Sequence, residues 1–168
     1  MTLARTDRFT AIDLLRGQHQ EVKDLFDALD ATQDLRDKQE LFHLLADLIA
    51  VHTRIEEQLF YPTIRERESN QEVLEAFDEH VGIKHLVTDL LETAAIDPSF
   101  DAKVSVLRAQ VEDHIAREED VLFTAARRLL GREELVLLAR EMSRLHDALE
   151  GSEPRFKLFE ELSQQPAY

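Results

Sequence analysis

Apolar residues recur at every third or fourth position through almost the whole 168-residue chain. This spacing places them on one side of an α-helix, and the strict alternation typical of a β-strand is absent. Four glycines and four prolines leave few positions at which helices can break. The pattern predicts an all-α protein, an antiparallel up-down four-helix bundle, with long helices over residues 10–30, 38–67, 70–95 and 100–130.

The segments outside these four helices divide the chain into three parts. Residues 1–9 are expected to form an N-terminal extension, residues 10–130 the bundle, and residues 131–168 a fifth helix with a C-terminal tail. Gly131 is expected to end the fourth helix, because glycine is common just after a helix. The fifth helix should cover one face of the bundle or form a dimer contact, so a monomer or a homodimer is expected.

The composition excludes several classes of protein. Asp and Glu number 35 against 20 Lys and Arg, and the resulting formal charge of −15 is unfavourable for binding nucleic acid or an anionic membrane. The lack of cysteine excludes disulfides, thiolate zinc sites and iron–sulfur clusters. The sequence shows neither a signal peptide nor a long apolar run. We therefore expect a cytoplasmic protein without a nucleic-acid or membrane partner.

Six polar side chains interrupt the apolar stripes of the four helices. Each stripe carries one histidine, and two of these histidines are followed four residues later by a glutamate. The six residues are His19, His52, Glu56, His80, His114 and Glu118. A carboxylate in a bundle core is strongly destabilising unless it is paired or bound to a metal. The set therefore predicts a metal site in the core of the bundle.

The motif His-x-x-x-Glu-Glu occurs twice, in HTRIEEQLFY (52–61) and in HIAREEDVLF (114–123), and the two copies align without gaps. A single histidine precedes each copy at a similar distance, His19 before the first and His80 before the second. The chain therefore resembles two helical hairpins that each supply half of a site. Two half-sites that meet in a bundle predict a two-metal centre of approximate twofold symmetry.

The donor set favours iron as the metal. Four imidazoles and two bridging carboxylates supply about eight donor atoms, whereas two six-coordinate metals that share an oxo or hydroxo bridge need about ten more. About two positions are thus left for water or a small ligand. Open positions and mixed nitrogen and oxygen ligands suit two iron ions better than manganese or zinc, since a structural zinc site is closed and four-coordinate.

Other polar residues near the motif have simpler interpretations. Glu57 and Glu119 lie about 100° around the helix from the expected ligands, so they should be solvated or should orient a ligating imidazole. His85 and Glu119 are kept as alternative additional ligands. Tyr61 is expected to pack in the core, with a hydrogen bond to a bound ligand as the alternative.

This arrangement resembles the hemerythrin-like family, in particular its HHE cation-binding domain. The family has a histidine on the first helix, His-x-x-x-Glu on the second, a histidine on the third and His-x-x-x-Glu on the fourth, and the six residues match it over roughly residues 10–130. The resemblance implies a non-haem di-iron centre, and relatives bind O₂, nitric oxide or peroxide, or sense iron. Oxygen-carrying hemerythrins have a second histidine where this chain has Lys84, which argues against reversible O₂ storage.

Three functions follow as alternatives. The first is a di-iron protein that binds or senses O₂, NO, peroxide or iron. The second is a di-iron enzyme with peroxide-decomposing (catalase-like) or oxidase activity, which is disfavoured because the sequence shows no catalytic acid–base pair and no cofactor loop. The third is a metal-free interaction bundle, which predicts that the substitution Glu118→Leu is harmless or stabilising.

Overall fold

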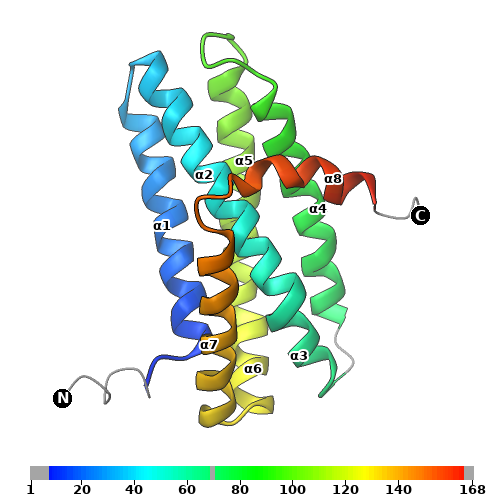
Figure 1. Cartoon of the computed structure of the whole chain (residues 1–168). Coiled ribbons are helices and arrows are strands. Elements are labelled where there is room, and N and C mark those ends of the chain that lie inside the picture. The colour runs from blue at the N-terminus through cyan, green and yellow to red at the C-terminus, as the bar shows by residue number, and fades with distance from the viewer. Residues whose placement is uncertain (1–7, 69–70, 165–168) are drawn as a thin grey trace, which may run out of the picture.

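The computed structural model describes residues 8–68 and 71–164, and within these ranges the chain forms helices and no β-strand. Four long helices lie side by side and alternate in direction (Figure 1): α1 (Ala11–Ala31), α2 (Leu35–Ile55), α4 (Gln71–Leu91) and α5 (Phe100–Arg117). Both α1 and α4 contact α2 and α5, so α1 and α4 occupy opposite corners of the bundle. The predicted four-helix bundle is confirmed. Residues 1–7 of the predicted extension, residue 70 and the last four residues lie outside the described ranges.

A capping box begins α1. The Thr10 side chain accepts a hydrogen bond from the Asp13 backbone N–H at 3.2 Å, and the Asp13 carboxylate accepts one from the Thr10 backbone N–H at 2.9 Å. We expect Thr10→Ala to lower the free energy of unfolding by about 1 kcal/mol in urea denaturation. The control is Thr124→Ala, because the exposed Thr124 hydroxyl bonds only to a carbonyl of its own helix. Equal effects of the two substitutions would contradict the role of the cap.

A π-helical turn follows two of the bundle helices, at the same point of the sequence repeat. The elements concerned are η1 (Glu56–Phe60) with α3 (Tyr61–Arg65), and η2 (Glu118–Leu122) with α6 (Phe123–Leu129). The Tyr61 N–H donates to the Glu56 carbonyl and the Phe123 N–H to the Glu118 carbonyl, five residues back instead of four. The predicted helices over 38–67 and 100–130 are therefore each interrupted by a π turn, which α-helical spacing did not indicate.

The extra residue in each π turn rotates the rest of the helix by about 100°. Val121, which α-helical spacing places inward, is 38% exposed for this reason, and Leu122 and Phe123 are buried instead. In the first copy of the repeat Phe60 and Tyr61 are likewise buried. Both glutamates of the motif thus begin a widened turn that directs the following aromatic residue into the core.

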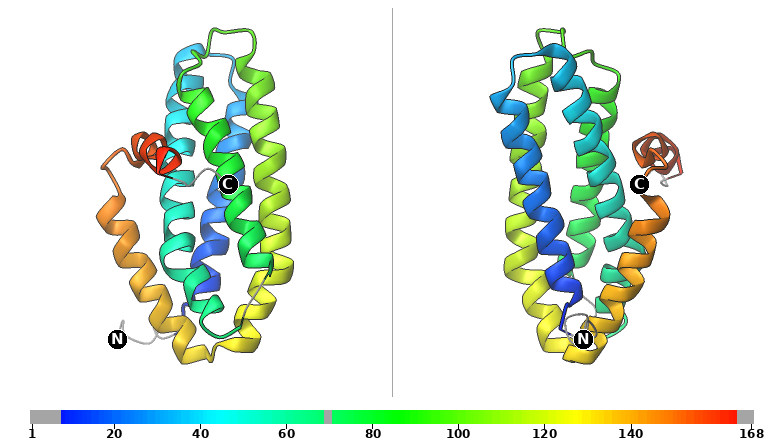
Figure 2. Two further views of the ribbon diagram at one scale, coloured as in Figure 1. Left: turned by 90° about the vertical axis from the view of Figure 1, so that its right-hand side faces the viewer. Right: turned by 60° about the vertical axis from the view of Figure 1, so that its left-hand side comes forward.

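The segment after residue 130 lies along the outside of the bundle (Figures 1 and 2). Helix α7 (Arg132–Leu149) packs against α1 and α2, and η3 (Pro154–Phe156) leads into α8 (Lys157–Ser163), which crosses α4. The fifth helix therefore covers one face of the bundle, one of its two predicted roles. The short helix α8 is anchored by Leu158, which is fully buried. No described helix is both long and apolar enough to span a bilayer.

Candidate metal centre

Six buried polar side chains form a layer between two apolar clusters of the core. On α1, for example, His19 lies between Leu15 of one cluster and Val22 of the other. The layer consists of His19, His52, Glu56, His80, His114 and Glu118, each no more than 6% exposed. Their donor atoms form two groups within 4.8 Å, one of His19, His52, Glu56 and Glu118 and one of Glu56, His80 and His114. All six residues predicted from the sequence therefore meet in one place.

The outward nitrogen of every imidazole in the layer has a hydrogen-bond acceptor. The four Nδ1 distances are 2.8 Å for His19 to Glu119, 2.8 Å for His52 to Gln18, 2.9 Å for His80 to Glu57 and 2.7 Å for His114 to Glu79. Carboxylate and amide oxygens accept hydrogen bonds, so each Nδ1 carries the hydrogen. In its neutral form each imidazole then presents an Nε2 lone pair to the interior, and this is the form of histidine that binds metals.

These inward lone pairs face other acceptors. The Nε2 atoms of His80 and His114 are 3.1 Å apart, and His19 Nε2 is 3.1 Å from Glu118 Oε2. Several of the inward atoms have no hydrogen-bond partner among the described residues: His19 Nε2, His52 Nε2, Glu56 Oε1 and both carboxylate oxygens of Glu118. Unsatisfied buried polar atoms are costly, and acceptors that converge on one another require a positive charge between them. The donor set therefore fits a bound cation.

Each glutamate of the layer lies near an imidazole of both half-sites. Glu56 places Oε1 3.0 Å from His52 Nε2 and Oε2 3.1 Å from His80 Nε2. Glu118 Oε2 is 3.1 Å from His19 Nε2 and 4.0 Å from His114 Nε2. Each carboxylate therefore lies between imidazoles of the two halves of the repeat.

The two carboxylates differ in proton affinity. Burial, together with the neighbouring Glu118 carboxylate, raises the pKa of Glu56 to about 8. Burial acts on Glu118 in the same direction, but His19 and His114 outweigh it and hold the pKa of Glu118 below its ordinary value. Two like charges this close and this deeply buried are not both ionised without a counter-charge, so Glu56 holds a proton at neutral pH in the metal-free protein. A cation in the layer would take the place of that proton.

The sequence profile of the Hemerythrin HHE cation binding domain matches residues 10–126 of the chain, a range that contains all six residues of the layer. The chain belongs to the hemerythrin HHE family. It is 30% identical over 129 residues to the DNA nickase of Nostoc sp. (strain PCC 7120 / SAG 25.82 / UTEX 2576), which is 77% of this chain but only 37% of that protein. The chain thus spans just over a third of the length of this relative.

The HHE fold is also seen in a solved structure. The crystal structure of a hemerythrin HHE cation binding domain-containing protein from Mycobacterium kansasii has a TM-score of 0.75 to this chain, at 21% identity and with 94% of both chains covered. That share is larger than residues 10–126, so the likeness of fold includes part of the segment after residue 130. The sequence had placed this segment outside the family resemblance.

Two aromatic residues break the symmetry of the HHE layer. Tyr61 and Phe123 occupy the same position of the repeat, and Phe123 stacks on His19 with ring centroids 5.8 Å apart. The Tyr61 hydroxyl instead lies 3.2 Å from Glu56 Oε2 and 3.2 Å from His80 Nε2. Burial raises the pKa of Tyr61 well above its ordinary value, so the phenol keeps its hydrogen. One half of the layer therefore has a hydrogen-bond donor that the other half lacks.

A buried lysine connects the HHE layer to the C-terminal helix α8. The Nζ of Lys84 lies 2.8 Å from Glu57 Oε1 and 3.0 Å from Glu161 Oε2 on α8. Burial alone would raise the pKa of Glu57, but His80 and Lys84 outweigh it and lower that pKa. Glu57 therefore stays charged and holds the His80 imidazole in orientation, and α8 supplies the second carboxylate that Lys84 needs in the core.

The sequence identified two of the four residues that accept a hydrogen bond from an imidazole Nδ1 atom. Glu57 and Glu119 were expected to be solvated or to orient a ligand, and the structure places both on an Nδ1 atom. Gln18 and Glu79 were missed because only the glutamates that follow Glu56 and Glu118 were considered as residues that orient an imidazole. Their signal was their matching place, directly before the first histidine of each half. His85 is exposed and lies outside both donor groups, which removes it as a candidate ligand.

Proposed function

We propose that the layer holds two iron ions bridged by Glu56 and Glu118, and that this centre binds a small ligand such as O₂, nitric oxide or peroxide. The observation that carries the proposal is that four imidazoles and two carboxylates converge in the core. Several of their inward atoms have no hydrogen-bond partner among the described residues. Iron suits this donor set, and when bound it would supply redox chemistry and open positions for a ligand.

The space beside the layer supports a small ligand. A cavity of about 120 Å³ reaches the layer at His114 and Glu118, and a water molecule takes up roughly 30 Å³ in the liquid. Such a space has room for a small ligand beside the layer. Tyr61 belongs to the other half of the repeat, but its hydroxyl lies 3.2 Å from His80 Nε2, where it can donate a hydrogen bond to a bound ligand.

The direct test is the metal content of the full chain after loading with Fe²⁺ and dialysis, with an absorption spectrum before and after reduction. We expect two irons per chain and an oxo-bridge absorption that reduction removes. Zero or one iron per chain would contradict the proposal.

Peroxide decomposition is the second candidate function, and the protonated Tyr61 phenol beside the layer favours it. Addition of hydrogen peroxide to the iron-loaded protein separates the two candidates. A binding protein reacts stoichiometrically, whereas an enzyme turns over many equivalents and loses this turnover in His114→Ala. Turnover that persists in His114→Ala would be assigned to iron outside the layer.

The name of the Nostoc relative does not lead us to propose DNA cleavage for this chain. The match covers 37% of that relative, so it does not carry the activity in that protein's name over to this chain. The net charge of −15 also repels a phosphate backbone. We therefore propose a small molecule rather than nucleic acid as the partner.

A further inference from the structure

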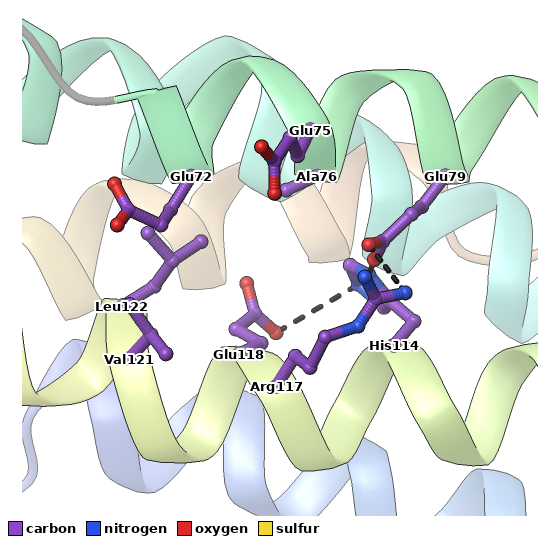
Figure 3. Close-up of a pocket in the computed structure, with 9 residues that line it drawn as sticks. All are labelled: Glu72, Glu75, Ala76, Glu79, His114, Arg117, Glu118, Val121 and Leu122. Carbon is purple, nitrogen blue, oxygen red and sulfur yellow. Dashed lines mark hydrogen bonds and ion pairs between the residues drawn. The ribbon is translucent and has the colours of Figure 1, made fainter.

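The cavity beside the layer lies between α4 and the turn that joins α5 to η2 (Figure 3). Its lining changes from its outer part to its inner end. Its outer part is lined by Glu72, Glu75, Glu79 and Arg117, and its inner end by His114 and Glu118. The cavity therefore joins an acidic surface to two residues of the layer.

The inner end of the cavity contains the carboxylate of Glu118, whose Oε2 atom lies 3.1 Å from His19 Nε2. Glu118 is 2% exposed, and neither of its oxygens has a hydrogen-bond partner among the described residues. Figure 3 shows its carboxylate directed into the space between the two helices. A buried, unsatisfied carboxylate at the end of a cavity is a strong attractor for a cation that enters from outside.

The outer part of the cavity has an excess of negative charge. Three glutamates of α4 line it at helical spacing, and Arg117 is the one basic residue among the lining residues. Arg117 lies 2.5 Å from Glu79 Oε1, and the other oxygen of Glu79 accepts the hydrogen bond of His114 at 2.7 Å. The guanidinium is therefore engaged by Glu79, while Glu72 and Glu75 are exposed at the mouth.

The sequence repeat provides an internal comparison. Aligned on the first histidine of each half, Glu75 and Ala76 correspond to Leu14 and Leu15. Leu15 is fully buried in the core, whereas Ala76 lines the cavity with a side chain three carbons shorter. The acidic mouth and the space behind it thus belong to one half of the molecule, and both arise from substitutions at neighbouring positions.

We propose that this cavity is the route by which divalent cations enter the layer, and that Glu72 and Glu75 attract them to its mouth. The inference rests on the proposed function, because it requires that the layer bind a metal. Carboxylates at a narrow opening raise the local concentration of cations and the rate of their capture. A hydrated cation would exchange water for glutamate oxygens as it passes inward to Glu118.

The test measures the rate at which the metal-free full-length protein takes up Co²⁺ in a stopped-flow instrument. The visible absorption of the ligated ion reports the uptake. In low salt, the double variant Glu72→Gln/Glu75→Gln should fill about tenfold more slowly, roughly threefold for each charge removed. High salt should abolish the difference, since it screens exposed charges. The final amount of bound Co²⁺ should not change, because neither residue belongs to the layer.

Two further variants make the result specific. Glu21→Gln removes one negative charge, against two in the double variant, from an exposed position of α1. Because α1 lies at the opposite corner of the bundle from α4, this variant should take up Co²⁺ at the wild-type rate. Ala76→Leu copies the other half of the repeat and should slow uptake at every salt concentration by filling the cavity. If Ala76→Leu does not fold, the double variant at exposed positions still decides the matter.

The outcomes separate the route from the proposed function. Full Co²⁺ binding with a wild-type rate in the double variant, or an equal slowing in Glu21→Gln, would overturn the route alone. A wild-type protein that retains no Co²⁺ at equilibrium would overturn the proposed function and the route together.

Discussion

Replacement of Glu118 by leucine is expected to leave the protein unable to retain metal through dialysis. Glu118 Oε2 lies 3.1 Å from an imidazole of one half-site and 4.0 Å from an imidazole of the other, so its loss removes a donor from both. Loss of a residue that only supports a ligand typically weakens metal binding about 10- to 100-fold. Loss of a bridging ligand should exceed the upper figure, as measured by metal content and by calorimetric titration.

The matched control is Glu119→Gln, one residue along the chain. Glu119 accepts a hydrogen bond from His19 Nδ1, and an amide oxygen can accept the same bond. We expect this variant to keep its metal with an affinity reduced about tenfold at most. The metal-free alternative predicts instead that Glu118→Leu is harmless or stabilising and that added metal changes nothing. Unchanged metal content in Glu118→Leu would contradict the proposed centre.

Removal of the metal should produce the second large effect, a loss of thermal stability. A ligand that binds only the folded state at 1,000 times its dissociation constant stabilises that state by about 4 kcal/mol. For a chain of this size the melting temperature should fall by about 10 °C when a chelator removes the metal. Differential scanning calorimetry with and without a chelator measures this shift, and coincident transitions would contradict it.

The stability of the metal-free protein should also depend on pH in a defined direction. The pKa of Glu56 is raised to about 8 by burial and by Glu118, whereas the unfolded value is 4.5. Between pH 6.5 and 8 the folded state therefore holds a proton that the unfolded chain has lost, and stability falls as pH rises. His19 acts in the same direction, because Glu118 outweighs burial and raises the pKa of His19. The lowered pKa of the buried His52 affects stability only below 6.5.

The fall due to Glu56 should amount to about 2 kcal/mol between pH 6.5 and 8, measured by urea denaturation of the metal-free protein. The control is Glu56→Gln, which cannot titrate and should show a smaller fall. Stability that rises over this range in the metal-free wild-type protein would contradict the assignment.

Several features of this fold were predictable from the sequence because they depend on short-range spacing. Apolar periodicity placed the four long helices correctly. The six polar residues stood out because each occupied a position on an otherwise apolar stripe. The repeat then indicated that two such halves share one layer, and the structure brings all six side chains together.

Other features depend on contacts between helices and had no comparable signal. Gln18 and Glu79 accept hydrogen bonds from histidines of neighbouring helices, and only their place directly before His19 and His80 could have indicated them. The ion pair that links α8 to the layer joins Lys84 on α4 to Glu57 on η1 and Glu161 on α8. It forms only when these three elements pack together. The π turns were missed because each adds only one residue to the α-helical spacing. An apolar stripe drawn with a constant 3.6 residues per turn does not show this shift.

The two π turns divide their helices into sections that are out of phase with each other. If either turn closed into an ordinary α-helix with all of its residues retained, every residue downstream would rotate by about 100°. Tyr61 or Phe123 would then leave the interior, although both helices would stay intact by any measure of helical content. The five-residue spacing between the glutamate of each motif and the aromatic residue is therefore what keeps that aromatic ring in the core.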